Sequence, residues 1–132
     1  MRHQMQFGDY LWNDRGIPAG PAWVRIDLAR QTLSVFRAGN EIGMTVILFG
    51  ADRKPTPLGV FSIQAKARTH RSTLYDAEMP FMLRLTADGV AIHASNVHEG
   101  AATHGCIGVP LAFARLLYGQ MKIGDQVAIV GA

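Results

Sequence analysis

Short stretches in which apolar and polar residues alternate dominate the sequence after Pro21, and they limit the possible folds more than any other feature. Residues 23–28 (WVRIDL) and 31–36 (QTLSVF) both alternate with period two, which is typical of a strand with one buried face. The connection at residues 29–30 suggests a hairpin, although it lacks the Asn-Gly type of dipeptide that would fix the turn. These segments predict a pair of strands at the start of a mainly β domain.

Further strands are expected where short apolar runs lie between turn residues. The Gly-Asn dipeptide at residues 39–40 marks a second turn. The run at residues 44–49 (MTVILF) is consistent with a strand buried on both faces. The remaining strands are expected at residues 58–63, 82–85, 90–93 and 126–130.

One segment favours a helix. Pro110 suits a first helical position, because the N–H group that proline lacks has no helical partner there. Glycine at position 119 or 124 provides an end. The apolar residues that follow helical spacing, and that we expect in the core, are Val109, Phe113, Leu116, Leu117 and Met121.

The composition supports one folded domain and excludes several classes of protein. A chain of 132 residues that is 48% apolar is too apolar for a disordered protein and long enough to bury a core. A single cysteine excludes a disulfide scaffold, and a net charge of +3 gives no reason to expect nucleic acid as a partner. No run approaches the roughly 18 apolar residues of a membrane helix, and no signal peptide is visible. We expect an irregular arm at residues 1–21 and one domain at residues 22–132.

The chemistry of the chain is concentrated in residues 90–110 (VAIHASNVHEGAATHGCIGVP), which hold the only cysteine and three of the five histidines. A thiol needs a base to become a good nucleophile at neutral pH, and an imidazole within hydrogen-bond distance is a suitable one. His93 closes a predicted strand and Cys106 precedes the predicted helix, whose start would favour a thiolate. Gly105 lets consecutive N–H groups at residues 104–106 converge, as an oxyanion hole requires.

Two other interpretations of the same residues are open. His93, His98, His104 and Cys106 are acceptable zinc ligands, but their intervals of four, five and one residues match no common zinc pattern. Glu99 is the one acidic residue nearby. A single cysteine is also commonly an inert, buried apolar residue, and His98 is expected to be a solvated loop residue.

Several motifs together resemble one known family. THGCIGV at residues 103–109, preceded by AIHA at residues 91–94, resembles the signature of the YkuD-type L,D-transpeptidase catalytic domain family. The further matches, which extend the resemblance over residues 22 to 130, are KPTPLGVFSI at 54–63, MPFMLRL at 79–85 and IGDQVAIV at 123–130. The resemblance implies a single-domain β-sandwich or barrel-like fold with a helix after the cysteine.

The resemblance also implies roles for individual residues. Cys106 is the implied nucleophile and His93 its general base. Ala94 follows that histidine and has no polar side chain, so its backbone carbonyl is what orients the imidazole. The implied oxyanion donors are the N–H groups of Gly105 and Cys106, while His104 shapes the site.

Candidate substrate-binding residues come from the resemblance and from charge. Thr103 keeps the hydroxyl group of the family's commoner serine, and Met79 begins the MPF stretch. Residues 52–71 hold five basic residues against one acidic residue, a local charge of +4 that can concentrate anionic ligands. Arg68 and Arg71 are therefore candidates for binding substrate carboxylates, with a solvated basic loop as the alternative.

The implied reaction is acyl transfer on bacterial peptidoglycan. The cysteine attacks a stem tetrapeptide, D-alanine leaves, and an amine of a neighbouring stem resolves the thioester to cross-link third-position residues. Water as acceptor would give an L,D-carboxypeptidase. No metal or organic cofactor is implied, carbapenem-type β-lactams are expected acylating inhibitors, and a periplasmic or cell-envelope location follows from the substrate. A zinc-binding β domain and a non-catalytic wall-binding module are the other hypotheses.

Two departures from the family pattern concern the acceptor. Gly108 stands where the family often has arginine or asparagine. The connection between His93 and Cys106 has 12 residues, which is short for the family. Both leave the choice between transpeptidation and hydrolysis open.

Overall fold

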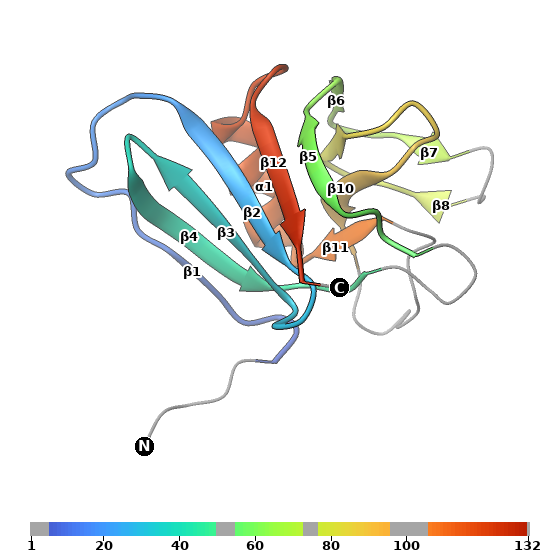
Figure 1. Cartoon of the computed structure of the whole chain (residues 1–132), viewed down its shortest axis with the longest axis horizontal. Coiled ribbons are helices and arrows are strands. Elements are labelled where there is room, and N and C mark those ends of the chain that lie inside the picture. The colour runs from blue at the N-terminus through green and yellow to red at the C-terminus, as the bar shows by residue number, and fades with distance from the viewer. Residues whose placement is uncertain (1–5, 50–54, 73–76, 96–105, 132) are drawn as a thin grey trace.

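Two β-sheets and one helix form the framework of the computed structural model, which describes residues 6–49, 55–72, 77–95 and 106–131 (Figure 1). The larger sheet has the order β1 (Tyr10–Trp12), β4 (Asn40–Val46), β3 (Thr32–Arg37), β2 (Ala22–Asp27), β12 (Gln126–Val130) and β5 (Gly59–Ser62). The smaller sheet has the order β11 (Ile107–Val109), β10 (Ala91–Ala94), β9 (Met82–Arg84) and β6 (Ala65–Ala67). β7 (Arg71–Ser72) and β8 (Ala77–Glu78) form a separate ladder, and α1 spans Leu111–Gln120. A mainly β fold with a helix after the cysteine is confirmed.

The alternating segments form the centre of the larger sheet. The hairpin prediction is correct: β2 pairs antiparallel with β3, from Ala22 opposite Arg37 to Asp27 opposite Thr32. The apolar residues on one face of each strand are fully buried, as the alternation requires, with Val24 of β2 opposite Val35 of β3. The last strand, β12, has the predicted bounds and pairs in parallel with β2.

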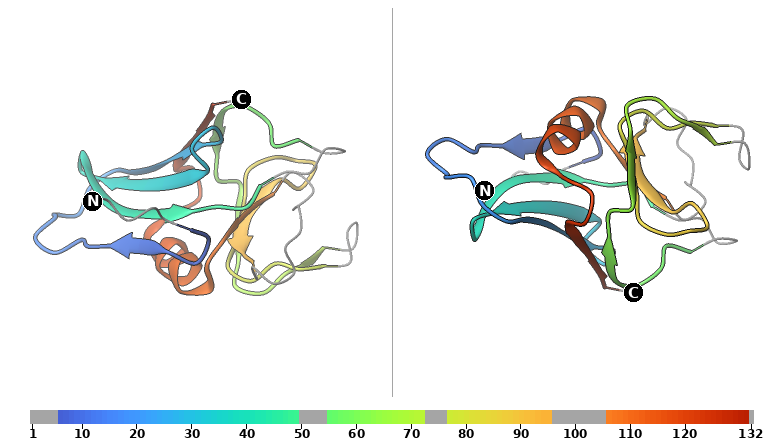
Figure 2. Two further views of the ribbon diagram at one scale, coloured as in Figure 1. Left: turned by 90° about the horizontal axis from the view of Figure 1, so that it is seen from below. Right: turned by 90° about the horizontal axis from the view of Figure 1, so that it is seen from above.

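The continuation of β4 joins the two sheets. Residues 44–49 were predicted to form one strand, but only residues 44–46 belong to β4, which ends at Val46. Beyond it, Leu48 and Gly108 exchange two backbone hydrogen bonds of 2.9 and 2.8 Å, which link the larger sheet to β11. Figure 2 shows α1 beside the sheets. Phe113 and Leu117 of the helix belong to the core, together with buried residues of both sheets.

The helix begins later than predicted, but four of the five residues expected in the core are buried: Val109, Phe113, Leu117 and Met121. Pro110 is the residue before the helix, with an extended backbone (φ −59°, ψ 146°), and Val109 belongs to β11. Phe113 and Leu117 are buried as expected, whereas Leu116 is 38% exposed. The helix ends at Gln120, between the two glycines that were considered. None of the described residues belongs to a helix that is long and apolar enough to cross a membrane.

A lysine from the smaller sheet completes the C-terminal end of α1. The Lys66 ammonium donates hydrogen bonds to the carbonyl oxygens of Tyr118 (2.8 Å) and Met121 (2.7 Å). It also lies 4.2 Å from the centre of the Tyr118 ring. A cation is favourable there because the last carbonyl groups of a helix lack partners and carry partial negative charge. Lys66 therefore stabilises the junction of β6 and α1.

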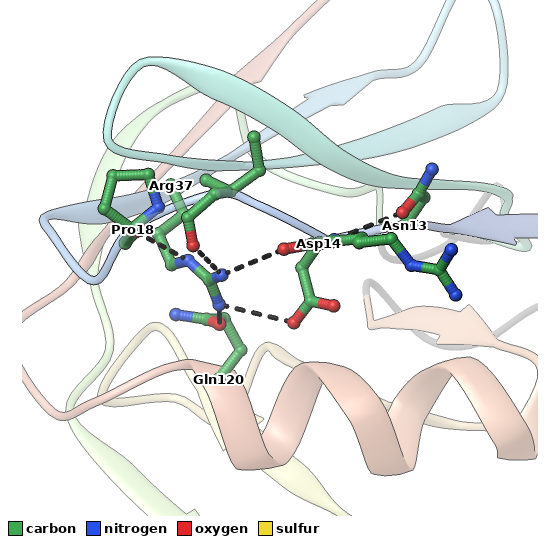
Figure 3. Close-up of polar contacts among 7 residues, drawn as sticks. Asn13, Asp14, Pro18, Arg37 and Gln120 are labelled. Carbon is green, nitrogen blue, oxygen red and sulfur yellow. Dashed lines mark hydrogen bonds and ion pairs between the residues drawn. The ribbon is translucent and has the colours of Figure 1, made fainter.

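The segment expected as an irregular arm is in part a packed edge of the sheet. β1 pairs antiparallel with β4, and Trp12 packs so closely on Gly43 that a Cβ atom there would lie 2.6 Å from the indole ring. The guanidinium of Arg37 donates to the backbone oxygens of Ile17 (2.7 Å) and Pro18 (3.1 Å) and to the Gln120 side chain (2.9 Å) (Figure 3). These contacts tie residues 10–18 to the sheet and the helix. The expectation of an irregular lead-in is wrong for β1, whereas residues 13–18 are irregular and held in place by Arg37.

Candidate active site

The smaller sheet presents two different faces. Alternate residues of its strands, such as Leu83, Ile92 and Ile107, belong to the main core. The residues between them point to the other side, where Met82, Ala91 and Cys106 pack with Met79 in a second, smaller cluster. We call this side the thiol face. Its residues are Ala65 and Ala67 of β6, Met82 and Arg84 of β9, Ala91 and His93 of β10, and Cys106 and Gly108 at β11.

Strand pairing places the candidate nucleophile and base on the thiol face together. β10 and β11 are parallel neighbours, with His93 opposite Gly108. Continuing this register by one residue before Ile92 and Ile107 puts Cys106 opposite Ala91. The cysteine and His93 are therefore diagonal neighbours, and strand spacings put their Cα atoms on the order of 8 Å apart.

The His93 side chain is held in one protonation state and one orientation. Its ring is mostly buried, with 9% of the residue exposed, and Nδ1 lies 2.7 Å from the carbonyl oxygen of Ala94. Since a carbonyl oxygen can only accept, Nδ1 carries the hydrogen and Nε2 keeps its lone pair. Burial lowers the pKa of His93 below its ordinary value, against a smaller opposing effect of the Ala94 hydrogen bond. The imidazole is thus neutral at pH 7, as a general base must be.

The thiol of Cys106 is buried at the start of β11. The residue is 2% exposed, and Sγ lies 3.5 Å from the carbonyl oxygen of Gly89. The predicted support from a helix start is wrong, because β11 follows the cysteine and α1 begins only at Leu111. Helix dipoles act within about one turn of the helix end. The start of α1 therefore gives no support to a thiolate at Cys106.

Three of the expected site residues, Thr103, His104 and Gly105, lie outside the described residues, and so does the candidate zinc ligand His98. The described ranges contain no group of three His, Cys, Asp or Glu side chains arranged to hold a metal ion. Two of the four candidate zinc ligands fall outside those ranges.

The candidate substrate-binding residues are separated by the fold. Met79 packs with Cys106 in the smaller cluster. Arg68 and Arg71 are both exposed, with Arg71 opposite Glu78 in the β7–β8 ladder. Lys66 turns to the C-terminal end of α1, so the basic segment does not form a single patch. Arg53 and Lys54 lie outside the described residues.

Two features of the thiol face were missed by the sequence reasoning. Position 108 has no room for a side chain, because a Cβ atom there would lie 2.6 Å from the Ser95 Cβ atom and 3.6 Å from that of Leu48. Arg84 also lies on this face, opposite Ala91. The alternation of Leu83 and Leu85 around it contained the signal, since a strand that buries both leucines turns the arginine to the other side.

Comparisons with known proteins show the family and the fold of the chain. A family model described as the L,D-transpeptidase catalytic domain (YkuD) matches residues 21–129. L,D-transpeptidase 1 of Mycobacterium tuberculosis is 26% identical over 134 residues, which cover 88% of this chain and 53% of that protein. The crystal structure of an L,D-transpeptidase from Stackebrandtia nassauensis superposes with a TM-score of 0.78 and 28% identity, covering 86% of this chain and 57% of that one.

A third relative was solved with a bound inhibitor fragment. L,D-transpeptidase 3 of Mycobacterium tuberculosis, in complex with a faropenem-derived adduct, superposes with a TM-score of 0.73 at 20% identity over 82% of this chain and 59% of that one. The chain spans somewhat more than half the length of these relatives. The fold, the family model and the matched motifs agree along nearly the whole domain, and the chain belongs to the YkuD family of L,D-transpeptidase catalytic domains.

Proposed function

We propose that the protein is a cysteine L,D-transpeptidase that acts on peptidoglycan stem tetrapeptides through a thioester intermediate. The observation that carries the proposal is the placement of Cys106 beside a neutral, oriented His93 on one face of two adjacent strands. A thiol and an imidazole fixed in this way are the parts that nucleophilic acyl transfer requires.

The first half-reaction forms the acyl-enzyme. Nε2 of His93 takes the proton from Sγ of Cys106, and the thiolate attacks the carbonyl carbon of the third stem residue. Backbone N–H groups of Cys106 and Gly105 receive the negative charge that develops on the carbonyl oxygen. The protonated imidazole then donates its proton to the departing nitrogen, so that D-alanine leaves as a neutral amine. A thioester between Sγ and the third residue remains.

The second half-reaction transfers the acyl group. An amine from the third residue of a neighbouring stem loses a proton to His93 as it attacks the thioester carbon. The carbon–sulfur bond breaks, the cysteine recovers the proton, and an amide joins the two stems. Water in place of the amine would release a tripeptide.

The wider setting follows from the same proposal. The faropenem-derived adduct of the Mycobacterium tuberculosis relative supports acylation of this thiol by penem and carbapenem β-lactams. A peptidoglycan substrate places the protein in the cell envelope. Residues 22–132 would form the catalytic unit, with His104 and Thr103 shaping the pocket next to the thiol.

Mass spectrometry tests the proposal directly. The wild-type protein and Cys106→Ala are incubated with purified stem tetrapeptide, with and without an amine acceptor. We expect the wild type to gain the mass of the tripeptide acyl group, to release D-alanine and to form a cross-linked dimer. The chain has one cysteine, so Cys106→Ala should show none of these. Turnover by the alanine variant would refute the proposal, and free tripeptide in place of dimer would assign hydrolysis instead.

A further inference from the structure

An arginine occupies the same row of the thiol face as the cysteine. Arg84 is paired with Ala65 on one side and with Ala91 on the other. Ala91 is in turn opposite Cys106 in the continued register of β10 and β11. Within this row, only the methyl group of Ala91 lies between the side chains of Arg84 and Cys106.

The guanidinium of Arg84 has an unsatisfied hydrogen-bond donor. Its Nε atom is buried and has no hydrogen-bond partner in the described part of the chain. No ion pair to Arg84 occurs there either, although Arg37 and Arg30 both form one. A buried, unpaired donor is costly, and a charged one more so. Such a group persists where a partner that is not part of the chain satisfies it.

The chemistry of that partner follows from the shape of the donor group. A guanidinium presents a planar fork of N–H donors and no acceptor, which matches the two oxygens of a carboxylate. The residues opposite Arg84 on both flanking strands are alanines. Neither alanine has a polar side chain that could bind the guanidinium in place of a ligand. Two other cations of the described part of the basic segment are less suited to this role, since Lys66 binds the end of α1 and Arg68 is exposed.

The separation from the thiol suits the substrate of the proposed reaction. Two strand spacings put the Cα atoms of Arg84 and Cys106 roughly 10 Å apart, and an arginine side chain is long enough to span part of that distance. In a stem tetrapeptide, one nitrogen and one Cα atom separate the scissile carbonyl carbon from the terminal carboxylate. A carboxylate bound by the fork would hold that carbonyl carbon over Sγ.

We propose that Arg84 binds the terminal carboxylate of the donor stem peptide and thereby positions the scissile carbonyl group at Cys106. This inference rests on the proposed function for the identity of the peptide. Arg84 thus takes the role for which the exposed Arg68 and Arg71 were candidates, that of binding a carboxylate of the substrate.

The test compares two donors that differ only in this carboxylate. One tetrapeptide ends in D-alanine and the other in D-alaninamide, and kcat/KM is measured for the wild type, Arg84→Gln, Arg84→Met and Arg25→Gln. Arg25 is a matched control, because its guanidinium lies 5.8 Å from the Phe36 ring on the larger sheet. We expect the wild type and the control to prefer the carboxylate donor by about 10- to 100-fold, the range of a charge-assisted hydrogen bond. Both Arg84 variants should lose the preference and keep most of their activity on the amide donor.

The binding of the same donors to Cys106→Ala separates this inference from the proposed function. Titration calorimetry should show tighter binding of the carboxylate donor, and Cys106→Ala/Arg84→Gln should bind both donors equally. A wild-type protein that turns over both donors equally would overturn the role of Arg84 and leave the function standing. Arg84 variants that lose activity equally on both donors would assign the residue a structural role and also overturn it. Turnover of neither donor, with the binding preference present and dependent on Arg84, would keep the carboxylate site and refute the transpeptidase.

Discussion

Replacement of Gly108 by alanine should destabilise the junction of the two sheets. A Cβ atom at this position would lie 2.6 Å from the Ser95 Cβ atom and 3.0 Å from its Oγ atom. The atom to be displaced is anchored to the backbone, and the Ser95 N–H donates to the Val109 carbonyl at 2.9 Å. To remove this clash, the backbone of the β10–β11 ladder would have to shift by a large fraction of an ångström.

The magnitude is the difference of two opposing effects. Forcing one extra methyl group into a packed site costs typically about 1–3 kcal/mol. Replacing a strand glycine by alanine recovers about 0.5–1 kcal/mol, because glycine loses more backbone entropy on folding. Gly108→Ala should thus lower the free energy of unfolding by about 1 kcal/mol, the difference between the middles of the two ranges.

A double-mutant cycle measured by urea unfolding tests this reasoning. Ser95→Gly removes the atoms that the new methyl group would meet, so Gly108→Ala/Ser95→Gly should regain most of the loss caused by Gly108→Ala. The coupling between the two sites should be about 1–2 kcal/mol and favourable. Gly119→Ala is the control, since nothing lies within 4 Å of a Cβ atom at that position. A neutral or stabilising Gly108→Ala, or a coupling near zero, would refute the steric explanation for glycine at this position.

Three further predictions concern charged and titratable groups. Burial lowers the pKa of His93 below its ordinary 6.5, so His93 takes up a proton at higher pH in the unfolded chain than in the folded one. The free energy of unfolding should therefore fall as the pH drops below about 6.5. The value of kcat/KM for the carboxylate donor should stay at its neutral-pH level to below pH 6.5. A His93→Gln variant with an unchanged stability profile would contradict this. Lys66→Met removes two charge-assisted hydrogen bonds to the end of α1 and should lower the free energy of unfolding by about 1–3 kcal/mol. An unchanged midpoint in chemical unfolding would contradict this. Arg37→Met releases the backbone oxygens of residues 14–18, so amide exchange in that segment should accelerate more than at β12, and uniform rates would argue against the clamp.

The strands that the sequence predicts well are those whose burial is decided locally. β2, β3 and β12 have five or six residues each, and each buries one side against a continuous core. The alternation is visible in the sequence because every second residue of these strands faces the core and the residues between them face away from it. β6, β7, β8 and β11 have two or three residues, too few for a period to be visible. These short strands depend on partners that are distant in sequence.

The same limit explains what was missed at the site. Val109 was assigned to the helix because its spacing from Phe113 fits a helical turn, whereas its pairing with Ala94 makes it part of β11. The motif pointed to His93 and Cys106 as chemically active residues, and the absence of a polar group at Ala94 pointed to its carbonyl oxygen. Arg84 could not be recognised as a site residue from the sequence, because only its pairing with Ala91 shows that it lies on the same face as the thiol.

The parallel pairing of β10 and β11 also accounts for the length of the connection between them. Two adjacent parallel strands cannot be joined by a tight turn, and the crossover needs about a dozen residues or more. Twelve residues, 95–106, separate the end of β10 from the start of β11. A connection of this length is therefore close to the minimum that the topology permits. Since Cys106 is its last residue and His93 lies next to the end of β10, any further deletion would break the pairing that brings thiol and imidazole together. Insertions carry no such topological cost, so variation in this connection among relatives with the same strand pairing should be toward greater length.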